Sequence, residues 1–264
     1  MRVLVWNIGA GSPGGSRRHE QAWRHLAERG DFDVALLQET EEPPAWRADH
    51  WRSVVWRPKY AQTRKGRKLW GCAVLALDLT LEAYEPTQDF PWLGALPGSS
   101  AVAWTTTGPK WLASVHLTAR PIAVDLLHTH PLEGIETTTR DGSLWETNVV
   151  PHELHRLFGQ ETFLWGGDLN CDPKMDDRPR FAGGTRRAFE IYREAGAVDA
   201  RTRFHSTYQQ TFFRPGTDSY QLDHVFVDRI TEGRLTSWAV DPLPATAADP
   251  LSDHAPIMLT LDAE

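Results

Sequence analysis

Short runs of apolar residues recur along the chain, and most are too short to form a helix. Five runs are rich in β-branched or aromatic residues and are bounded by glycine, proline or charge: residues 3–6, 34–37, 111–115, 162–165 and 222–227. Runs of this length and composition are typical of buried β-strands. Further strands are expected at about residues 52–57, 70–78, 101–106, 235–240 and 255–261.

Longer segments with helical periodicity separate some of these runs. Helices are expected at about residues 16–29, 146–159 and 186–195. Ser16 is a suitable N-cap for the first helix, and Trp23, Leu26 and Ala27 form its apolar stripe. Between residues 118 and 144 no period is apparent, which predicts a long surface loop that can shape a substrate cleft.

Polar residues stand at the ends of several apolar runs, and this is the most informative feature of the pattern. They are Asn7, Glu39, His116, Asp168, Asn170, Asp253 and His254. Each one alone is better explained as a structural residue, such as a turn former, a surface acid or a cap. Several polar groups at the ends of buried strands are costly to desolvate unless they share an ion or a substrate, so the set indicates an active site. Carboxylate oxygens suit magnesium, and imidazoles can donate to phosphoryl oxygens, as divalent-metal phosphodiester hydrolysis requires.

The motifs around these residues resemble those of the endonuclease/exonuclease/phosphatase superfamily, which has a deoxyribonuclease-I-like fold. They are Val-Trp-Asn-Ile at 5–8, Leu-Gln-Glu at 37–39, Val-His-Leu at 115–117, Gly-Asp-Leu-Asn at 167–170, Leu-Asp-His-Val-Phe at 222–226 and Ser-Asp-His at 252–254. Each motif alone is weak evidence for the resemblance, but six motifs in the order of the family are specific evidence. The resemblance implies a four-layer α/β sandwich in which two packed, mostly antiparallel β-sheets are flanked by helices. It also implies one catalytic domain spanning residues 1–264.

The resemblance also implies a metal site. Glu39 is expected to be the principal ligand of a magnesium ion, for which manganese can substitute, with Asn7 and Asp253 close to the ion. No thiol cluster competes with these oxygen donors, since Cys72 and Cys171 lack CxxC spacing. A separate zinc site built from His128, His130, His152 and His155 is disfavoured for the same reason.

The remaining residues of the set are expected to act on the phosphate and on water. By resemblance, Asp168 orients or deprotonates the attacking water and Asn170 contacts the scissile phosphate. His254 contacts the phosphate and is held by Asp223, and His116 is a second phosphate donor. The chain departs from the abasic-site endonuclease branch, which carries a tyrosine and a nearby Pro-Asn where this sequence reads Ser-Val-His-Leu at 114–117. Abasic repair is therefore the less expected role.

The composition of the chain bears on whether it binds nucleic acid. The chain has 264 residues, of which 41% are hydrophobic, and a formal net charge of −7. An acidic protein does not coat nucleic acid by bulk attraction, so a local basic patch would be needed. The densest basic stretch comprises Arg57, Lys59, Arg64, Lys65, Arg67 and Lys68. We interpret Arg64, Lys65, Arg67 and Lys68 either as contacts to phosphates flanking the scissile one or as a solvated hairpin loop.

Aromatic residues upstream of Asp223 provide a second candidate substrate contact. Phe212 and Phe213 are placed where members of this superfamily often have aromatics near the sugar or base of the substrate. Stacking on a base contributes about 1 to 3 kcal/mol, so one exposed ring can decide a preference for unpaired nucleotides. Packing beneath the site is the alternative for these phenylalanines.

These observations favour a magnesium-dependent phosphodiesterase, and most of all a nuclease that hydrolyses DNA or RNA by in-line attack of water. Two alternatives stay open: a phosphatase or phosphodiesterase acting on a small nucleotide or lipid phosphoester, and a noncatalytic binding module that kept the fold. The chain begins with a strand rather than a leader and has no apolar stretch long enough to span a membrane, so a cytoplasmic location is expected. The sequence does not determine the oligomeric state.

Overall fold

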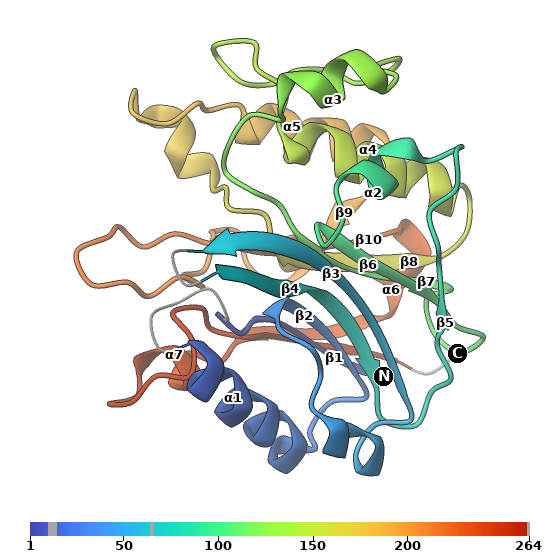
Figure 1. The fold of residues 1–264 in the computed structure, drawn as a ribbon, viewed down its shortest axis with the longest axis vertical. Coiled ribbons are helices and arrows are strands. Elements are labelled where there is room, and N and C mark those ends of the chain that lie inside the picture. The colour runs from blue at the N-terminus through green and yellow to red at the C-terminus, as the bar shows by residue number, and fades with distance from the viewer. Residues whose placement is uncertain (10–14, 64–65, 263–264) are drawn as a thin grey trace.

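Two six-stranded β-sheets face each other in the computed structural model, which describes residues 1–9, 15–63 and 66–262 (Figure 1). The first sheet has the strand order β11-β12-β1-β2-β4-β3. Its strands are β1 (Arg2–Asn7), β2 (Val34–Thr40), β3 (Ser53–Thr63), β4 (Gly66–Ala76), β11 (Leu235–Val240) and β12 (Ile257–Leu261).

The second sheet has the order β5-β6-β7-β8-β10-β9. Its strands are β5 (Glu82–Ala83), β6 (Ser100–Trp104), β7 (Trp111–His116), β8 (Phe163–Asp168), β9 (Val198–Asp199) and β10 (Asp223–Val227). The β1–β2 and β7–β8 pairs are parallel, and all other described pairs are antiparallel.

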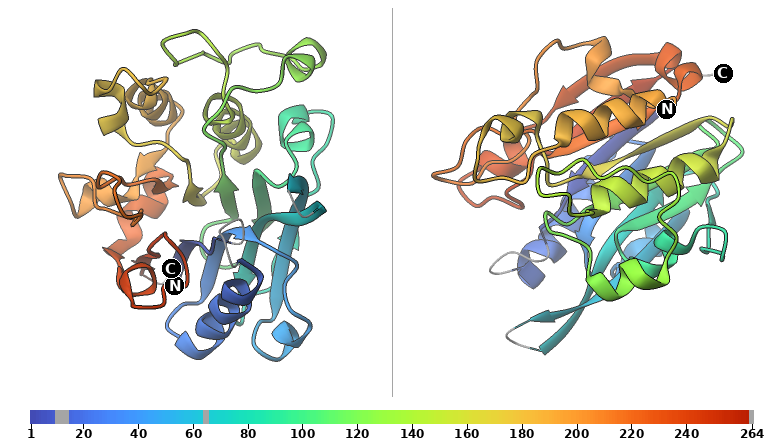
Figure 2. Two further views of the ribbon diagram at one scale, coloured as in Figure 1. Left: turned by 60° about the vertical axis from the view of Figure 1, so that its left-hand side comes forward. Right: turned by 90° about the horizontal axis from the view of Figure 1, so that it is seen from above.

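Helices cover the outer faces of both sheets. They are α1 (Gly15–Arg29), α2 (Pro91–Ala95), α3 (Val124–Thr129), α4 (Glu146–Phe158), α5 (Thr185–Glu194), α6 (Arg229–Arg234) and α7 (Leu243–Thr246), with 3₁₀ turns η1 (Ala45–Asp49), η2 (Pro173–Asp177) and η3 (Ala200–Arg203). Helix α1 packs on the first sheet, and Figure 2 shows α4 and α5 together over the second. The predicted sandwich of two packed, mostly antiparallel sheets with flanking helices is confirmed. Among the described helices, none is long and apolar enough to cross a membrane.

The alternation of side chains along β1 explains how the layers form. Val3 and Val5 point into the core between the two sheets, whereas Leu4 and Trp6 point outward and pack on α1. Because successive side chains of a strand point to opposite faces, an apolar run buried on both faces requires a layer on each side. On α1, Trp23 is fully buried in this outer layer, as the predicted stripe requires.

Two differences from the sequence prediction concern the hairpin of β3 and β4 and the segment predicted as a loop. Strand β3 ends later and strand β4 begins earlier than predicted, because their pairing continues to Thr63 and Gly66. Beyond the pair of Thr40 with Gly71, β2 no longer accompanies β4, so the hairpin projects from the sheet (Figure 2). In the segment predicted as a loop, residues 124–129 form the short helix α3, which has no buried residue and therefore leaves no apolar stripe to detect.

Candidate active site

Three strands of the second sheet bring polar side chains into one row. His116 at the end of β7 pairs with Asp168 at the end of β8, and Asp168 pairs with Asp223 at the start of β10. Adjacent strands lie about 4.8 Å apart, so register alone places these side chains beside one another. All three are at least 95% buried.

The first sheet adds two residues from the facing layer. Asn7 ends β1, and its Nδ2 donates to Asp168 Oδ2 at 2.8 Å and to Glu39 Oε1 at 3.4 Å. The backbone N–H of Gly9 donates to Asn7 Oδ1 at 2.9 Å and fixes the orientation of the amide. Asn7, the last residue of β1, thus connects the two sheets.

The backbone is unusual at two of the predicted residues. Glu39 and Asn170 have φ angles of 51° and 52°, and within the described ranges no other residue except glycine has a positive φ. At Glu39 the register of β2 against β4 shifts between Leu37 and Thr40, as in a β-bulge. Such conformations cost about 1 to 3 kcal/mol and cluster at functional sites. The bulge turns Glu39 toward Asn7 and His116.

His254 reaches the site from the segment before β12 and is held by β1. Ser252 Oγ donates to the Asn7 carbonyl at 2.7 Å and accepts from the His254 N–H at 3.1 Å. Trp6 Nε1 donates to the His254 carbonyl at 2.9 Å. The first strand therefore aligns the last motif of the chain.

Both histidines lie close to the carboxylates of the site. His254 Nδ1 lies 2.8 Å from Asp223 Oδ2, and its Nε2 lies 3.7 Å from Asp168 Oδ2. His116 Nε2 lies 3.5 Å from Glu39 Oε1 and 3.8 Å from Asp168 Oδ2. Asp168 thus lies within 4 Å of both imidazoles.

The carboxyl group of Asp168 has a pKa near neutrality. Burial, together with the charges of Asp223 and Glu39, raises the pKa of Asp168 from 3.8 to about 7, although the positive charge of His254 opposes this shift. The N–H of Asn170 donates to Asp168 Oδ1 at 2.8 Å. A carboxyl group with a pKa near the working pH is suited to general-base catalysis.

The two imidazoles differ in charge. Burial lowers the pKa of His254, but the charges of Asp223 and Asp168 and the hydrogen bond to Asp223 outweigh this effect and raise the pKa to about 10. For His116, burial dominates and lowers the pKa to about 4, although the charge of Glu39 opposes it. His254 is therefore a cation at neutral pH, and His116 is a neutral donor or acceptor.

We predict that Asp223→Asn lowers the pKa of His254, because the nearest charge favouring the imidazolium is removed. In wild type the pKa rises from 6.5 to about 10 on folding. The resulting stabilisation is complete below about pH 6.5 and is lost as the pH rises through about 10. Asp223→Asn should thus lower the melting temperature more at pH 6 than at pH 10, and NMR titration of the imidazole measures the shift.

The matched comparison is the double variant with His254→Ala. If the two residues act as a unit, the double variant is little less active than His254→Ala alone. Multiplicative losses of activity, or an unchanged imidazole pKa in Asp223→Asn, would contradict the pairing.

Several predicted residues take peripheral positions. Asn170 Nδ2 donates to the Leu117 carbonyl at 3.0 Å, which places the amide beside His116. The ring of Phe212 lies 5.0 Å from that of His254, whereas Phe213 contacts Asp253 through its backbone, with N–H to carbonyl at 2.7 Å. The Asp253 carboxylate is half-buried.

The basic stretch is described only in part. Arg64 and Lys65 lie outside the described residues. The backbones of Arg67 and Lys68 belong to β4, where they pair with Gln62 and Ala61 of β3. Their positions agree with the predicted hairpin, and both interpretations of the four cations stay open.

The donor set fits a divalent metal ion. Within the described part of the chain, potential ligand atoms lie within 4.8 Å of one another in two groups, Glu39 with His116 and Asp168, and Asp168 with Asp223 and His254. Asp223 Oδ1 is buried and receives no hydrogen bond from a described residue. Carboxylate oxygens are ligands that Mg²⁺ and Mn²⁺ prefer. Neither group contains Asp253 or the four histidines considered for zinc.

One supporting residue was missed by sequence reasoning. Glu146 at the start of α4 is buried, and its Oε2 accepts from Ser99 Oγ at 3.1 Å and from the Thr118 N–H at 2.8 Å. The Ser99 carbonyl in turn accepts from the His116 N–H at 2.9 Å. Glu146 thus ties together the segments on both sides of His116. Its position at a helix start looks like an ordinary cap, so no signal in the sequence distinguishes it.

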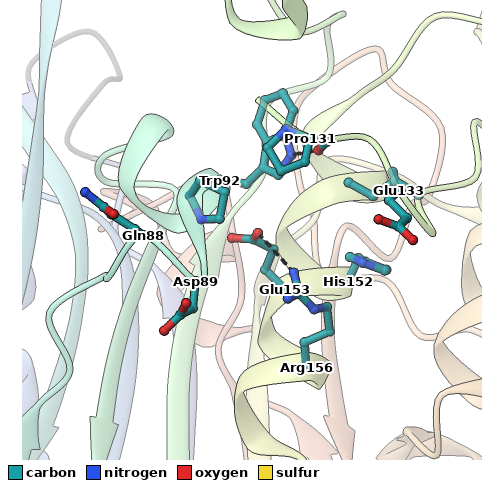
Figure 3. A pocket seen from close by; sticks show the side chains of 10 residues that line it. Gln88, Asp89, Trp92, Pro131, Glu133, His152, Glu153 and Arg156 are labelled. Atoms are coloured by element: carbon teal, nitrogen blue, oxygen red, sulfur yellow. Dashed lines mark hydrogen bonds and ion pairs between the residues drawn. The ribbon is translucent and has the colours of Figure 1, made fainter. Parts of the chain in front are cut away.

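A separate cavity of about 470 Å³ lies between α2, α4 and the segment at Pro131 (Figure 3). His152, Glu153 and Arg156 of α4 line it. The carboxylate of Glu153 accepts from the Leu93 N–H at 3.0 Å and so stabilises the start of α2. None of the predicted site residues lines this cavity.

Comparisons with known proteins agree with the fold described above. A profile of the Endonuclease/Exonuclease/phosphatase family matches residues 4–254. No curated protein sequence matches the chain significantly. Among solved structures, the 3′ phosphatase NExo from Neisseria bound to a product DNA hairpin is 16% identical, with a TM-score of 0.71 and 99% of each chain covered. An AP endonuclease from Archaeoglobus fulgidus is 17% identical, with a TM-score of 0.71 and 100% of each chain covered. The AP endonuclease LMAP from Leishmania major is 17% identical, with a TM-score of 0.67, and the match covers 100% of this chain and 88% of that one.

Proposed function

Because the chain belongs to the endonuclease/exonuclease/phosphatase family, we propose that it is a divalent-metal-dependent phosphodiesterase that cleaves nucleic acid. Membership of this family makes the protein a phosphoester hydrolase. The observation that best supports the finer assignment is the convergence of Glu39 and two histidines on Asp168, with His116 neutral and His254 protonated.

Glu39 would hold a magnesium or manganese ion, with Asn7 beside it and Asp253 at the edge of the site. When bound, the ion supplies a Lewis acid that polarises the phosphoryl group and offsets the negative charge developing on it. Glu39 is suited to this role because its carboxylate is only partly buried and faces His116 and Asn7.

The protein's own groups would carry the proton and orient the phosphate. Asp168 accepts a proton from the attacking water, since its pKa of about 7 keeps a useful fraction of the carboxylate ionised at neutral pH. The imidazolium of His254 donates to a phosphoryl oxygen, and His116 and the Asn170 amide provide further neutral contacts. Preorganised donors of this kind stabilise the charge that develops in the transition state.

The substrate is proposed to be nucleic acid on two grounds. The solved structures with this fold include a 3′ phosphatase with a DNA hairpin and two AP endonucleases. The hairpin that carries the basic stretch begins beside the site, where the flanking phosphates of a polymer would run. The net charge of −7 favours the alternative, a small nucleotide or lipid phosphoester.

A substrate panel separates these proposals. The purified protein with Mg²⁺ is incubated with single- and double-stranded DNA, DNA containing an abasic site, RNA, cyclic dinucleotides, phosphoinositides and sphingomyelin. Cleavage of a polynucleotide supports the proposal. Cleavage of a small or lipid phosphoester alone would replace it with the alternative, and binding without hydrolysis of any substrate would favour a noncatalytic module.

The cations of the hairpin give a second prediction. Replacing Arg64, Lys65, Arg67 and Lys68 together by glutamine should weaken polynucleotide binding and flatten its dependence on salt, because fewer counterions are released. Each lost phosphate contact on a single strand reduces the slope of log K against log salt by about 0.7. Fluorescence anisotropy over a salt series measures this slope. An unchanged slope would place the four cations on a solvated loop.

A further inference from the structure

His116 has an aromatic neighbour that belongs to the base of the β3–β4 hairpin. The rings of Trp70 and His116 lie 5.0 Å apart at 61°, an edge-to-face contact. On the opposite strand, Lys59 pairs with Trp70, and its Nζ lies 4.7 Å from the centre of the indole ring. The ammonium and the imidazole thus contact the same ring.

Close packing fixes the position of this pair. Gly71 follows Trp70, and a Cβ at that position would lie 2.1 Å from the Arg57 carbonyl oxygen and 2.8 Å from Pro58 Cα, so β3 and β4 approach unusually closely here. On its other side, Lys59 packs against Gly98, where an added Cβ would come within 2.9 Å of the lysine stem. Gly98 precedes Ser99, whose carbonyl accepts from the His116 N–H. The lysine stem and His116 are therefore held by the same short segment.

The Lys59 ammonium is available for an anion. It forms no ion pair with a described residue, although carboxylates are the most numerous charged groups of the adjoining site. Its charge is close enough to contribute to the lowered pKa of His116. A cation–π contact with an indole ring is weak compared with a charge-assisted contact to phosphate, so it does not prevent the ammonium from turning toward a phosphate.

We propose that Lys59 binds the phosphate next to the scissile one and that Trp70 is a positioning residue that fixes the Lys59 ammonium relative to His116. This inference rests on the proposed function and narrows the substrate to polynucleotides, which carry a second phosphate next to the one that is cleaved. A diester that carries a single phosphate has no group for Lys59 to bind.

The test separates binding from catalysis. Binding of fluorescein-labelled eight-nucleotide DNA and RNA is measured by fluorescence anisotropy in EDTA over a salt series. Lys59→Met should weaken binding by about tenfold, because one charge-assisted contact is lost. The slope of log K against log salt should fall by about 0.7. Lys110→Met is the matched control, since Lys110 lies at the far end of β7 in an exposed ion pair with Glu161.

Two outcomes would overturn the inference. One is a Kd and salt slope for Lys59→Met equal to those of Lys110→Met, and the other is a wild-type protein that binds neither oligonucleotide. Hydrolysis of bis(p-nitrophenyl) phosphate with Mg²⁺ is assayed in parallel, because this diester has no flanking phosphate. Absence of hydrolysis by the wild-type protein would contradict the proposed function and leave the binding result for Lys59 to be judged by itself.

The role of Trp70 is tested by a pair of substitutions. Trp70→Leu removes the ring and should raise KM for the oligonucleotide several-fold more than it lowers kcat, whereas Trp70→Phe keeps an aromatic face and should restore most of the loss. Equal effects of Leu and Phe would mean that Trp70 does not position Lys59.

Discussion

Asp168→Asn is expected to lower kcat by roughly 10³-fold while the protein stays folded. The carboxylate accepts hydrogen bonds from the Asn7 amide and the Asn170 N–H, both at 2.8 Å, and burial raises its pKa to about 7. Asparagine keeps the shape but cannot take a proton from water, and a general base contributes about 10² to 10⁴ in rate. Hydrolysis of bis(p-nitrophenyl) phosphate at saturating metal measures the loss.

The same variant tests the assigned pKa. In wild type, activity should rise as the pH increases through about 7, because Asp168 must be ionised to accept the proton. This rise of activity with pH should be absent from the residual activity of Asp168→Asn. Asp177→Asn is the matched control, since Asp177 is exposed and pairs with Arg186. Near-wild-type activity of Asp168→Asn would remove this residue from the mechanism, and a melting temperature lowered by more than about 5 °C would indicate a structural role instead.

Glu39→Gln is expected to lower activity by at least about a hundredfold at low metal concentration, with partial recovery as the concentration rises. Glu39 is the acidic residue that a β-bulge turns into the site, and it lies within 4.8 Å of potential ligand atoms of His116 and Asp168. Glutamine removes the charge but keeps an oxygen, so metal affinity should fall more than activity at saturation. Kinetics over a metal series and Mn²⁺ binding followed by EPR provide the two readouts.

The control for this variant is Glu42→Gln, an exposed acid that follows the same strand. A ligand role for Glu39 predicts weaker Mn²⁺ binding in Glu39→Gln and wild-type binding in Glu42→Gln. Unchanged Mn²⁺ affinity in both would assign the metal to other residues.

The sequence predicts the strands and the site from the same signal, a short apolar run that ends in a polar residue. This works at His116 and Asp168 because register pairs them at the ends of neighbouring strands, and at Asn7 because its strand ends opposite them in the facing sheet. It also works for the pair of Asp223 and His254, which the motifs suggest and the 2.8 Å contact agrees with. The roles proposed for these residues rest on the family resemblance.

Other parts of the site could not be predicted, because they depend on contacts between distant segments. Glu146 supports His116 through Ser99 and Thr118, and nothing near Glu146 in the sequence marks it. Trp70 and Lys59 become neighbours of His116 only because the β3–β4 hairpin extends past β2. The charge states of the two histidines likewise depend on burial, which no local pattern encodes.

The central claim is that this site hydrolyses phosphodiesters with a divalent metal ion, and one measurement tests it most directly. The rate of bis(p-nitrophenyl) phosphate hydrolysis is recorded for wild type and Asp168→Asn, first in EDTA and then as Mg²⁺ or Mn²⁺ is added back. We predict no hydrolysis in excess EDTA, saturable recovery with either metal for wild type, and almost none for Asp168→Asn. Full wild-type activity in excess chelator, or equal recovery by both proteins, would contradict the account.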